Sequence, residues 1–320
     1  MTRRACLIEP CVMIDILLKT LPFFAVIGLG YLAGRRGFFT PEATGYLTKF
    51  VFYFALSAFL FRFSATLPLS SVLQPDFIFA YLSASALVYG FALLVALGRK
   101  VPLDEAAIEA HCAVIGNVGF LGVPMLALLM GPEAIGYVVM VLAVDLILFG
   151  SLIVMLIVGS RDGQVRFATL WALVLGLLKN PMIMSISAGF IWSGLGLPIL
   201  APLDEFLSML GSAATPGALF AIGASLAFKS AERLHVAAWI SFLKLVIHPA
   251  AVAISALFIF QLDSYAASVM LAAAALPVAG NVYILAQHYA VAPVRVSASI
   301  LISTFFSILT VPAVIAWLNP

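Results

Sequence analysis

The sequence predicts an all-α polytopic membrane protein whose ten transmembrane helices form two inverted halves of five. Its 320 residues are 64% hydrophobic and only 9% charged, whereas a soluble protein usually carries about a quarter charged residues. The apolar residues lie in continuous runs of about twenty, which is the length that an α-helix needs to cross a bilayer. A transmembrane β-barrel would instead alternate apolar and polar residues in short segments.

Each apolar run is predicted to be one helix. Residues 1–12 precede the first run and are interrupted by Glu9 and Pro10, so we expect them to be an N-terminal extension. Residues 159–180 are expected to be a cytoplasmic linker, in which Phe167–Leu178 is apolar but too short to cross. The predicted spans are residues 14–34, 42–63, 75–98, 105–130, 133–158, 181–200, 202–228, 237–260, 265–290 and 295–318.

Basic residues concentrate in alternate loops, and this asymmetry predicts the orientation. Cytoplasmic loops of membrane proteins carry an excess of Lys and Arg. The loops around Pro132, Asp204 and Asp263 contain neither. The other set of loops contains Arg35, Arg36, Arg99, Lys100, Arg161, Arg166, Lys179, Lys229, Arg233 and Arg295. We therefore expect a protein of the inner (cytoplasmic) membrane with both termini outside the cytoplasm.

The fourth and ninth spans each contain residues that interrupt a helix. The fourth carries Gly116, Asn117, Gly119, Gly122 and Pro124 within GNVGFLGVP, and the ninth carries a matching PVAGNVY at 277–283. Glycine and proline weaken or break helices. In hydrocarbon, an unwound backbone is tolerated only where it is buried in protein or lines a cavity. Paired broken helices therefore predict the central binding site of a transporter.

The two interruptions are also the clearest sign of an internal repeat. Gly116–Asn117–Val118 recurs 164 residues later as Gly280–Asn281–Val282, and the same offset brings spans one to five onto spans six to ten. We interpret residues 13–158 and 181–320 as two repeats. Because each has an odd number of spans, the second must enter the membrane from the opposite side, which makes the repeat inverted.

These motifs resemble the auxin efflux carrier family, whose members include the PIN-formed transporters of plants. The resemblance is carried by GNVGFLGVP at 116–124 and LPVAGNVYILAQHY at 276–289. It is supported by Leu21–Pro22–Phe23 with Gly28–Leu29–Gly30–Tyr31, by Asn180–Pro181, and by Pro216 with Ile222–Gly223–Ala224–Ser225–Leu226. It covers the chain from Met13 onward. The long cytoplasmic loop of the plant members is missing, so the chain is similar to the compact prokaryotic form.

The resemblance implies a fold related to sodium–proton antiporters and bile-acid transporters. In that fold a scaffold (spans 1, 2, 6 and 7) holds a transport domain (spans 3–5 and 8–10), and helices four and nine cross at their prolines. It also implies export of a small organic anion, such as a carboxylate, and homodimers through the scaffold. Auxin itself is not implied. The sequence contains no nucleotide-binding loop or metal-ligand cluster, so we expect neither cofactor nor metal, and no nucleic-acid partner.

The expected substrate site lies at the two interruptions. Each following half-helix would present free backbone N–H groups and a partial positive charge, which favour an anion. Asn281 is expected to cap a half-helix that begins at Val282. Tyr283 and Gln287 lie four residues apart and can reach the same cavity. The predicted substrate-binding residues are Asn117, Gly119, Gly122, Pro124, Pro277, Gly280, Asn281, Tyr283 and Gln287. The alternative is that these glycines and prolines only allow close helix packing.

Ionisable residues also lie deep in the spans. Asp145 is about 18 Å along its helix from Glu133 at 1.5 Å per residue, and hence near the midplane. Lys244 lies in the eighth span with His248 one turn beyond, so we expect Lys244 to reach Asp145. A static structural pair and proton exchange at Asp145 or His248 are both open interpretations. Lys49 is expected to extend its ammonium group to the cytoplasmic surface.

The sequence thus favours a secondary active transporter that exports a small organic anion by alternating access. One alternative is a sodium- or proton-coupled carrier of another substrate. An intramembrane enzyme would need a nucleophile with a base, or paired membrane aspartates, and Asp145 is the single acid predicted near the midplane. A channel or receptor fits the hydropathy equally well.

Overall fold

The computed structural model describes residues 10–66, 74–162, 179–228 and 234–318. In these residues the regular structure is helical apart from one isolated β-bridge. They form twelve continuous helices, if π-helical turns (η) are joined to their neighbours and α12 is joined to α13 across Ala213. Six of these are long and apolar enough to cross a membrane. The all-helical polytopic class is confirmed. Phe167–Leu178 and most of the predicted extension lie outside the described residues.

The helices of the first half follow the predicted spans closely. The first begins at Pro10, inside the predicted extension. The elements are α1 (Pro10–Arg35), α2–η1–α3 (Pro41–Phe50, Val51–Ala55, Leu56–Thr66), α5 (Pro75–Gly98), α6 (Leu103–Val114), η2–α7 (Val118–Gly122, Val123–Met130) and α8–η3–α9 (Ala134–Ala143, Val144–Phe149, Gly150–Asp162).

The helices from Pro181 onward also follow the predicted spans, apart from one that is shorter than expected. The predicted span 181–200 ends early, because the chain turns at Gly196 with φ +64°. The elements are α11 (Pro181–Gly194), α12–α13 (Ala201–Ser212, Ala214–Leu226), α14–η4–α15–η5 (Leu234–Phe242, Leu243–Ile247, His248–Ile254, Ser255–Ile259), α16 (Ser264–Ala274), α17 (Gly280–His288) and α18 (Pro293–Leu318).

Several helices begin where the sequence carries a capping residue. Asn180 precedes Pro181, and its Oδ1 accepts a hydrogen bond from the N–H of Met182 at 3.0 Å. Asp263 accepts from the N–H groups of Tyr265 and Ala266 at 3.0 Å. Such side chains satisfy N–H groups that have no partner inside the helix, so these polar residues fix where α11 and α16 start.

Glycines allow the close contact between α1 and α13. A Cβ added at Gly223 would lie 1.9 Å from the carbonyl oxygen of Ile27, and one at Gly30 would lie 2.2 Å from that of Phe220. Small residues at such contacts let helix backbones approach each other within a membrane. The motifs around Gly30 and Gly223 therefore hold these two helices together.

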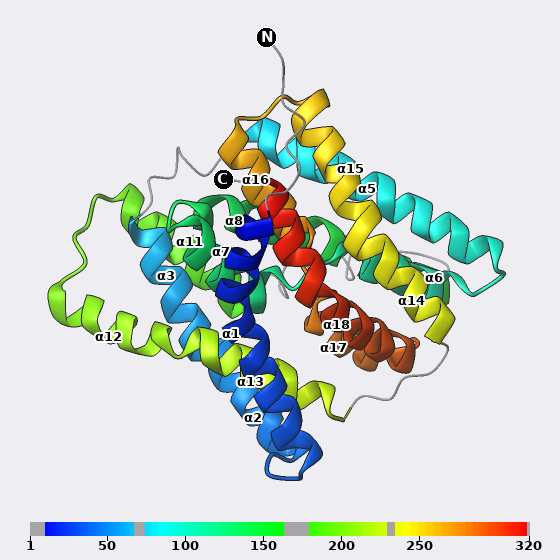
Figure 1. The fold of residues 1–320 in the computed structure, drawn as a ribbon, viewed down its shortest axis with the longest axis horizontal. Helices are drawn as coiled ribbons and strands as arrows, with labels where there is room; N and C mark the ends of the chain where they lie inside the picture. Colours follow the sequence, from blue (N-terminus) through cyan, green and yellow to red (C-terminus); the bar gives the residue numbers. More distant parts are fainter. Residues whose placement is uncertain (1–9, 67–73, 163–178, 229–233, 319–320) are drawn as a thin grey trace.

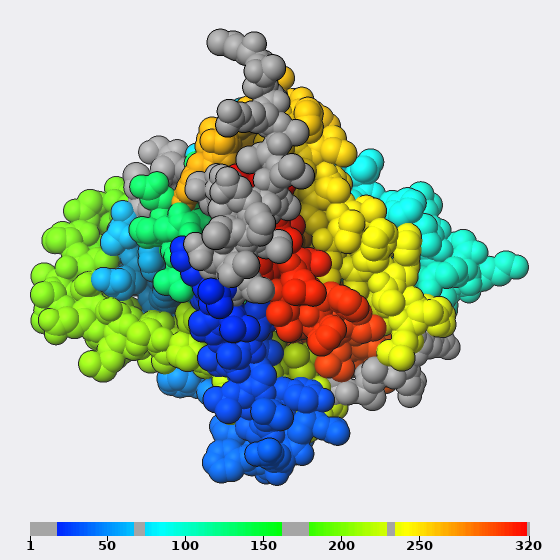
Figure 2. All heavy atoms as spheres, viewed as in Figure 1, coloured from blue at the N-terminus to red at the C-terminus, as the bar shows by residue number. Residues whose placement is uncertain are grey.

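Figure 1 shows two groups of helices. Helices α1, α2, α3, α11, α12 and α13 lie toward the left and bottom of the view, where α1 packs on α13 and α3 packs on α11 and α12. Helices α5, α6, α14 and α15 lie toward the right, where α5 packs on α6 and α15. Between the groups, α1 and α18 are side by side on the face shown in Figure 2.

In the described part of the chain, five π-helical turns lie within helices or at their ends. They contain Phe52 in η1, Phe120 in η2, Asp145 in η3 and Lys244 in η4. A π turn is rare and occurs often at functional sites. These four residues lie on or beside the cavity described below.

Candidate functional site

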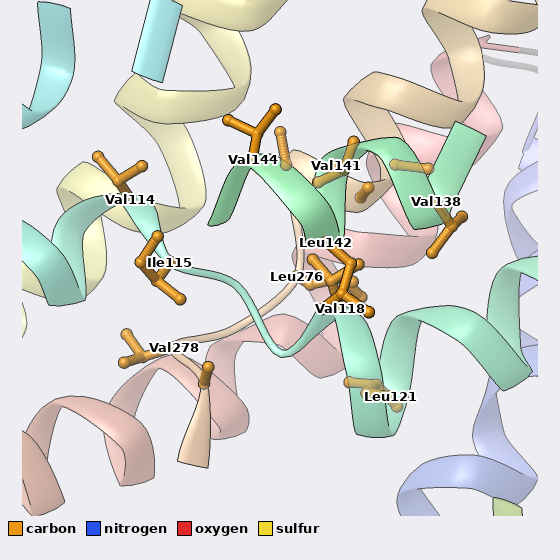
Figure 3. Packing of buried hydrophobic residues seen from close by; sticks show 14 of the residues in the cluster. Val114, Ile115, Val118, Leu121, Val138, Val141, Leu142, Val144, Leu276 and Val278 are labelled. Carbon is orange, nitrogen blue, oxygen red and sulfur yellow. The ribbon is translucent and has the colours of Figure 1, made fainter. Parts of the chain in front are cut away.

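The two interrupted helices cross each other as short extended segments. The N–H of Asn117 donates to the carbonyl of Pro277 at 2.8 Å, and the N–H of Ala279 donates to the carbonyl of Ile115 at 3.1 Å. The two bonds form an antiparallel bridge between Gly116 and Val278. Figure 3 shows the stretch after Ile115 passing the stretch that leads to Val278. The open backbone is thus satisfied within protein, as hydrocarbon requires.

Each interruption is shorter than its motif. The first ends at Asn117, because Leu121 and Gly122 both donate backbone hydrogen bonds to the Asn117 carbonyl and so resume helical structure at Val118. Pro124 therefore lies in the first turn of α7 and not at the crossing, which corrects the expectation that the helices cross at both prolines. Pro277 does lie at the crossing.

The expectation for Asn281 as a helix cap is also wrong. Helix α17 begins at Gly280, and Ala279 is its N-cap. The N–H of Val282 donates to the carbonyl of Ala279 at 3.3 Å, so Asn281 lies inside the first turn and not at the position before it. The Asn281 side chain is left to face the cavity.

Backbone N–H groups at both helix starts are free of protein acceptors in the described part of the chain. These groups belong to Gly119 and Phe120 at the start of η2, and to Gly280 and Asn281 at the start of α17. The first N–H groups of a helix carry its partial positive charge. Two such ends beside one cavity favour a bound anion.

A cavity of about 100 Å³ lies at the crossing. Its polar lining comes from Asn117, Asp145, Asn180 and Asn281, which lie on four separate segments of the chain. Phe52 and Phe120 close one side, with their rings stacked at a centroid distance of 5.9 Å. The remaining lining residues are Ile115, Gly116, Gly119, Leu142, Leu146, Met182 and Ala279.

A second cavity of about 430 Å³ adjoins the first. The two share Phe52, Ile115, Asp145, Leu146 and Asn281 as lining residues. The second continues along His111, Gly150, Val282, Ile284, Leu285 and His288. It therefore leads from the crossing toward the end of the molecule where α17 stops and the loop before Arg295 begins.

The structure brings some of the predicted site residues to the cavities. Asn117, Gly119 and Asn281 line them, whereas Gly122, Pro124, Pro277, Gly280, Tyr283 and Gln287 are outside the lining. A Cβ at Gly122 would lie 2.6 Å from Leu276 Cδ1, so this glycine serves close packing. The Gln287 amide donates to the Tyr283 hydroxyl at 2.9 Å, on the exposed side of α17.

The deep ionisable residues lie close together without a direct ion pair between Asp145 and Lys244. The Tyr81 hydroxyl donates to Asp145 Oδ1 at 2.9 Å. Asp145 Oδ2 is buried and has no hydrogen-bond partner among the described residues. Because Asp145 lines both cavities, this free oxygen is available to a ligand or a proton.

Lys244 lies beside the crossing, next to Gly116, but outside the lining of both cavities. Its Nζ donates to the carbonyl of Ala274 and lies 3.1 Å from His248 Nδ1. His248 Nε2 lies 3.0 Å from the Ser85 hydroxyl. Lys244 and His248 are completely buried, and neither lines the cavities.

Sequence reasoning missed several of the lining residues. Phe52 and Phe120 line the cavity, and Tyr81 bonds to Asp145 behind it. All three are aromatic residues within apolar spans, and nothing in the sequence distinguishes them from packing residues. The sequence does single out Asn180, because it stands before Pro181 at the start of a span. An Asn–Pro pair in that place indicates a helix cap and not a cavity residue. Its capping role is real, and the same residue also lines the cavity.

An ion-pair network lies beside the wider cavity. Arg295 is buried on α18 and donates to Glu109 at 2.5 Å and to Glu105 at 2.9 Å. Glu109 also pairs with Arg99. Arg161 donates to the carbonyl of Tyr289 at 2.7 Å. These bonds connect the loop before α6 and the start of α18 to α6, and they connect the end of α9 to the residue that follows α17.

Known proteins resemble this chain over most of its length. Residues 15–315 match the family described as membrane transport protein. The chain is 30% identical over 299 residues to a Rhizobium meliloti (strain 1021) protein named "Putative malonate transporter", which covers 91% of this chain and 92% of that protein. It is 27% identical over 298 residues to the Escherichia coli (strain K12) "Uncharacterized transporter YfdV", covering 91% and 94%.

A more distant similarity covers part of a larger protein. The "Lysosomal cholesterol signaling protein" of Mus musculus is 27% identical over 220 residues, which are 64% of this chain but 25% of that protein. The family match and the bacterial relatives span both interruptions and the cavity between them. The resemblance carried by GNVGFLGVP and LPVAGNVYILAQHY is confirmed, and the chain belongs to the auxin efflux carrier family of membrane transport proteins.

Proposed function

We propose that this transporter is a secondary active exporter of a small organic anion, and that it works by alternating access. The observation that carries this proposal is the polar cavity at the crossing of two interrupted helices, deep in an otherwise apolar protein. Transporters bind substrate where discontinuous helices meet near the midplane, with helix N-termini pointing at anionic groups.

The cavity offers suitable partners for a carboxylate. Free N–H groups at the starts of η2 and α17 supply partial positive charge. The amides of Asn117 and Asn281 supply further hydrogen-bond donors. The volume of about 100 Å³ fits a molecule of few heavy atoms. We therefore propose a short mono- or dicarboxylate, and the relative named for malonate supports that choice.

Proton coupling is the second candidate within the same function. Asp145 Oδ2 is buried, free of hydrogen bonds among the described residues, and on the wall of both cavities. A carboxylate beside an anion site is unfavourable unless it is protonated. We propose that Asp145 takes up a proton when substrate binds and releases it when the cavity empties. A sodium-coupled carrier of another substrate remains the alternative.

The architecture that we propose has two inverted repeats, residues 13–158 and 181–320. Helices α1, α2, α3, α11, α12 and α13 would form the scaffold, and the contacts among them support that grouping. The remaining helices would form the transport domain, with the linker 159–180 in the cytoplasm. Homodimers through the scaffold and both termini outside complete the proposal. In that orientation the wider cavity faces the cytoplasm, as loading of an exporter requires.

Counterflow in proteoliposomes tests the function. Vesicles loaded with unlabelled malonate should accumulate labelled malonate, and indole-3-acetate should compete poorly because its fused rings exceed the smaller cavity. A matched vesicle with the Asn281→Ala variant should accumulate less, whereas Gln287→Ala should equal the wild type. Absence of counterflow for every short mono- and dicarboxylate tried would reject the substrate class.

A further inference from the structure

We propose that the ammonium group of Lys244 acts as a built-in cation at the helix crossing, in the place where a coupling metal ion would otherwise bind. The consequence is a carrier that does not require sodium at the crossing. The inference concerns the crossing itself, so it holds whichever anion is carried.

The first observation is the position of Lys244 relative to the helix ends. Helices α6 and α16 stop at Val114 and Ala274, just before the two extended segments meet. Lys244 Nζ donates to the carbonyl of Ala274. It also packs against Gly116, where an added Cβ would lie 3.3 Å from Nζ. The lysine thus lies beside the C-terminal ends of both half-helices.

Those ends carry partial negative charge. The last carbonyl groups of a helix lack partners inside it, and cations are favoured beside them. In transporters with broken helices, unwound carbonyls and half-helix C-termini are the groups that coordinate a sodium ion or a proton. The position that Lys244 fills is therefore a cation position by its electrostatics.

The second observation is that the Lys244 side chain is enclosed by protein and its nitrogen faces hydrogen-bond acceptors. Lys244 is completely buried. The short contact to His248 Nδ1 makes that nitrogen the acceptor, and places the ring hydrogen on Nε2, facing the Ser85 hydroxyl. His248 is then neutral and adds no competing positive charge. Asp145 makes no direct ion pair with Lys244 and is bonded to Tyr81, whose ring contacts His248.

The crossing therefore has a side with partial positive charge from helix starts and a side with partial negative charge from helix ends. The positive helix starts and the asparagine amides face the cavity, and the negative helix ends face Lys244. A metal ion in the second position would be free to leave and couple transport to its gradient. An ammonium group on a side chain cannot leave.

Thermal unfolding of purified protein in three salts tests this assignment. We would compare the wild type, Lys244→Ala and a surface control, Lys49→Ala, at equal concentrations of sodium, choline and methylammonium chloride. Lys49 is exposed on α2, so its removal deletes the same charge without touching the crossing. The wild type and the control should unfold at one temperature in all three salts.

The Lys244→Ala variant should behave differently. It should unfold at a lower temperature in choline, and sodium or methylammonium should raise that temperature by about 2–4 °C, because a small cation binds the vacated position. Equal stabilisation of the wild type by sodium would overturn the proposal. Failure of both small cations to stabilise the variant would overturn it too, because the lysine would then serve only hydrogen bonding and packing.

A second variant is needed in case Lys244→Ala does not fold. Lys244→Met keeps most of the side-chain volume without the charge, and should show the same dependence on sodium. Should neither variant be recovered, counterflow by the wild type decides. Undiminished exchange after sodium is replaced by choline agrees with a built-in cation, and loss of exchange contradicts it.

Discussion

At the scale of single residues, the side chains at the crossing divide into those that line the cavity and those that hold its walls. Asn117 and Asn281 line it, whereas Gly122 packs against Leu276 and Gln287 bonds to Tyr283. The sequence motifs could not predict which residues line the cavity, because all four residues lie near an interruption. Substitutions at the lining residues should therefore affect substrate binding, whereas substitutions at the packing residues should not act on binding directly.

Replacing either cavity asparagine should weaken substrate binding. Asn117→Ala and Asn281→Ala each remove a polar partner inside a largely apolar cavity, which should cost about 1–3 kcal/mol of binding free energy. The measurement is the affinity of purified variants for malonate, alongside their thermal unfolding. Gln287→Ala is the matched control and should bind normally. Wild-type affinity in both asparagine variants would move the site away from the crossing.

Replacing Asp145 should remove the response to a pH gradient. Asp145→Asn keeps the shape and the hydrogen-bond acceptor for Tyr81 but cannot exchange a proton near neutral pH. We expect folded protein whose exchange no longer changes when a pH gradient is imposed across the proteoliposome. A well-folded variant that still responds like the wild type would exclude Asp145 from coupling. Recovery of lost stability in an Asp145→Asn, Lys244→Met double variant would favour a structural pair instead.

At the scale of helices, the contacts that fix the architecture are backbone contacts made by glycine. Gly30 and Gly223 let α1 and α13 approach until carbonyl oxygens occupy the space of a Cβ. Both glycines belong to motifs that could be recognised in the sequence, but the sequence did not show that they lie at the same contact between α1 and α13. Gly28, one of the glycines in the same motif as Gly30, has no atom within 4 Å of its added Cβ.

This difference predicts opposite outcomes for two similar substitutions. Gly223→Ala should destabilise the protein by about 1–3 kcal/mol or more, because the new methyl group overlaps the Ile27 carbonyl and the helices must move apart. Gly28→Ala should leave stability unchanged or raise it slightly, since alanine favours a helix. Thermal unfolding in detergent measures both. Equal stability of the two variants would show that the α1–α13 contact tolerates separation.

At the scale of the whole molecule, the orientation in the membrane decides which side the wider cavity faces. That cavity leads toward the loop before Arg295, on the side of the basic loops. The excess of Lys and Arg there predicts the cytoplasmic side. An exporter observed in this state would be ready to accept substrate from the cell interior.

Cysteine labelling tests the orientation. In a background without Cys6, Cys11 and Cys112, Phe38→Cys places a thiol on a residue that is 83% exposed, beside Arg35 and Arg36. It should react with an impermeant reagent in inverted membranes but not in intact cells. Leu200→Cys, at a residue that is 68% exposed on the opposite side, should react in intact cells. The reverse pattern would invert the proposed topology.

The sequence predicted the helical class, most of the helix positions and the place of both interruptions, because these depend on apolar run length and on glycine and proline. It did not predict how far each interruption extends. That extent depends on which N–H groups find carbonyl partners, as when Leu121 and Gly122 both bond to Asn117. Nor did it reveal that Lys244 bonds to a helix end and not to Asp145, since both partners lie far away in sequence.

The π-helical turn at Asp145 has a consequence for how this chain tolerates insertions and deletions. A π turn closes an i to i+5 hydrogen bond, and the N–H of Gly150 donates to the carbonyl of Asp145 in this way. The extra residue brings Asp145 and Gly150 to the wall of the same cavity. Deleting one residue within η3 would convert the wide turn to regular α-helix and leave α8 and α9 close to their present register. A one-residue deletion here should therefore change the cavity wall locally, at Asp145 and Gly150, whereas a deletion in the regular α-helical part of α9 would turn every residue beyond it by about 100°.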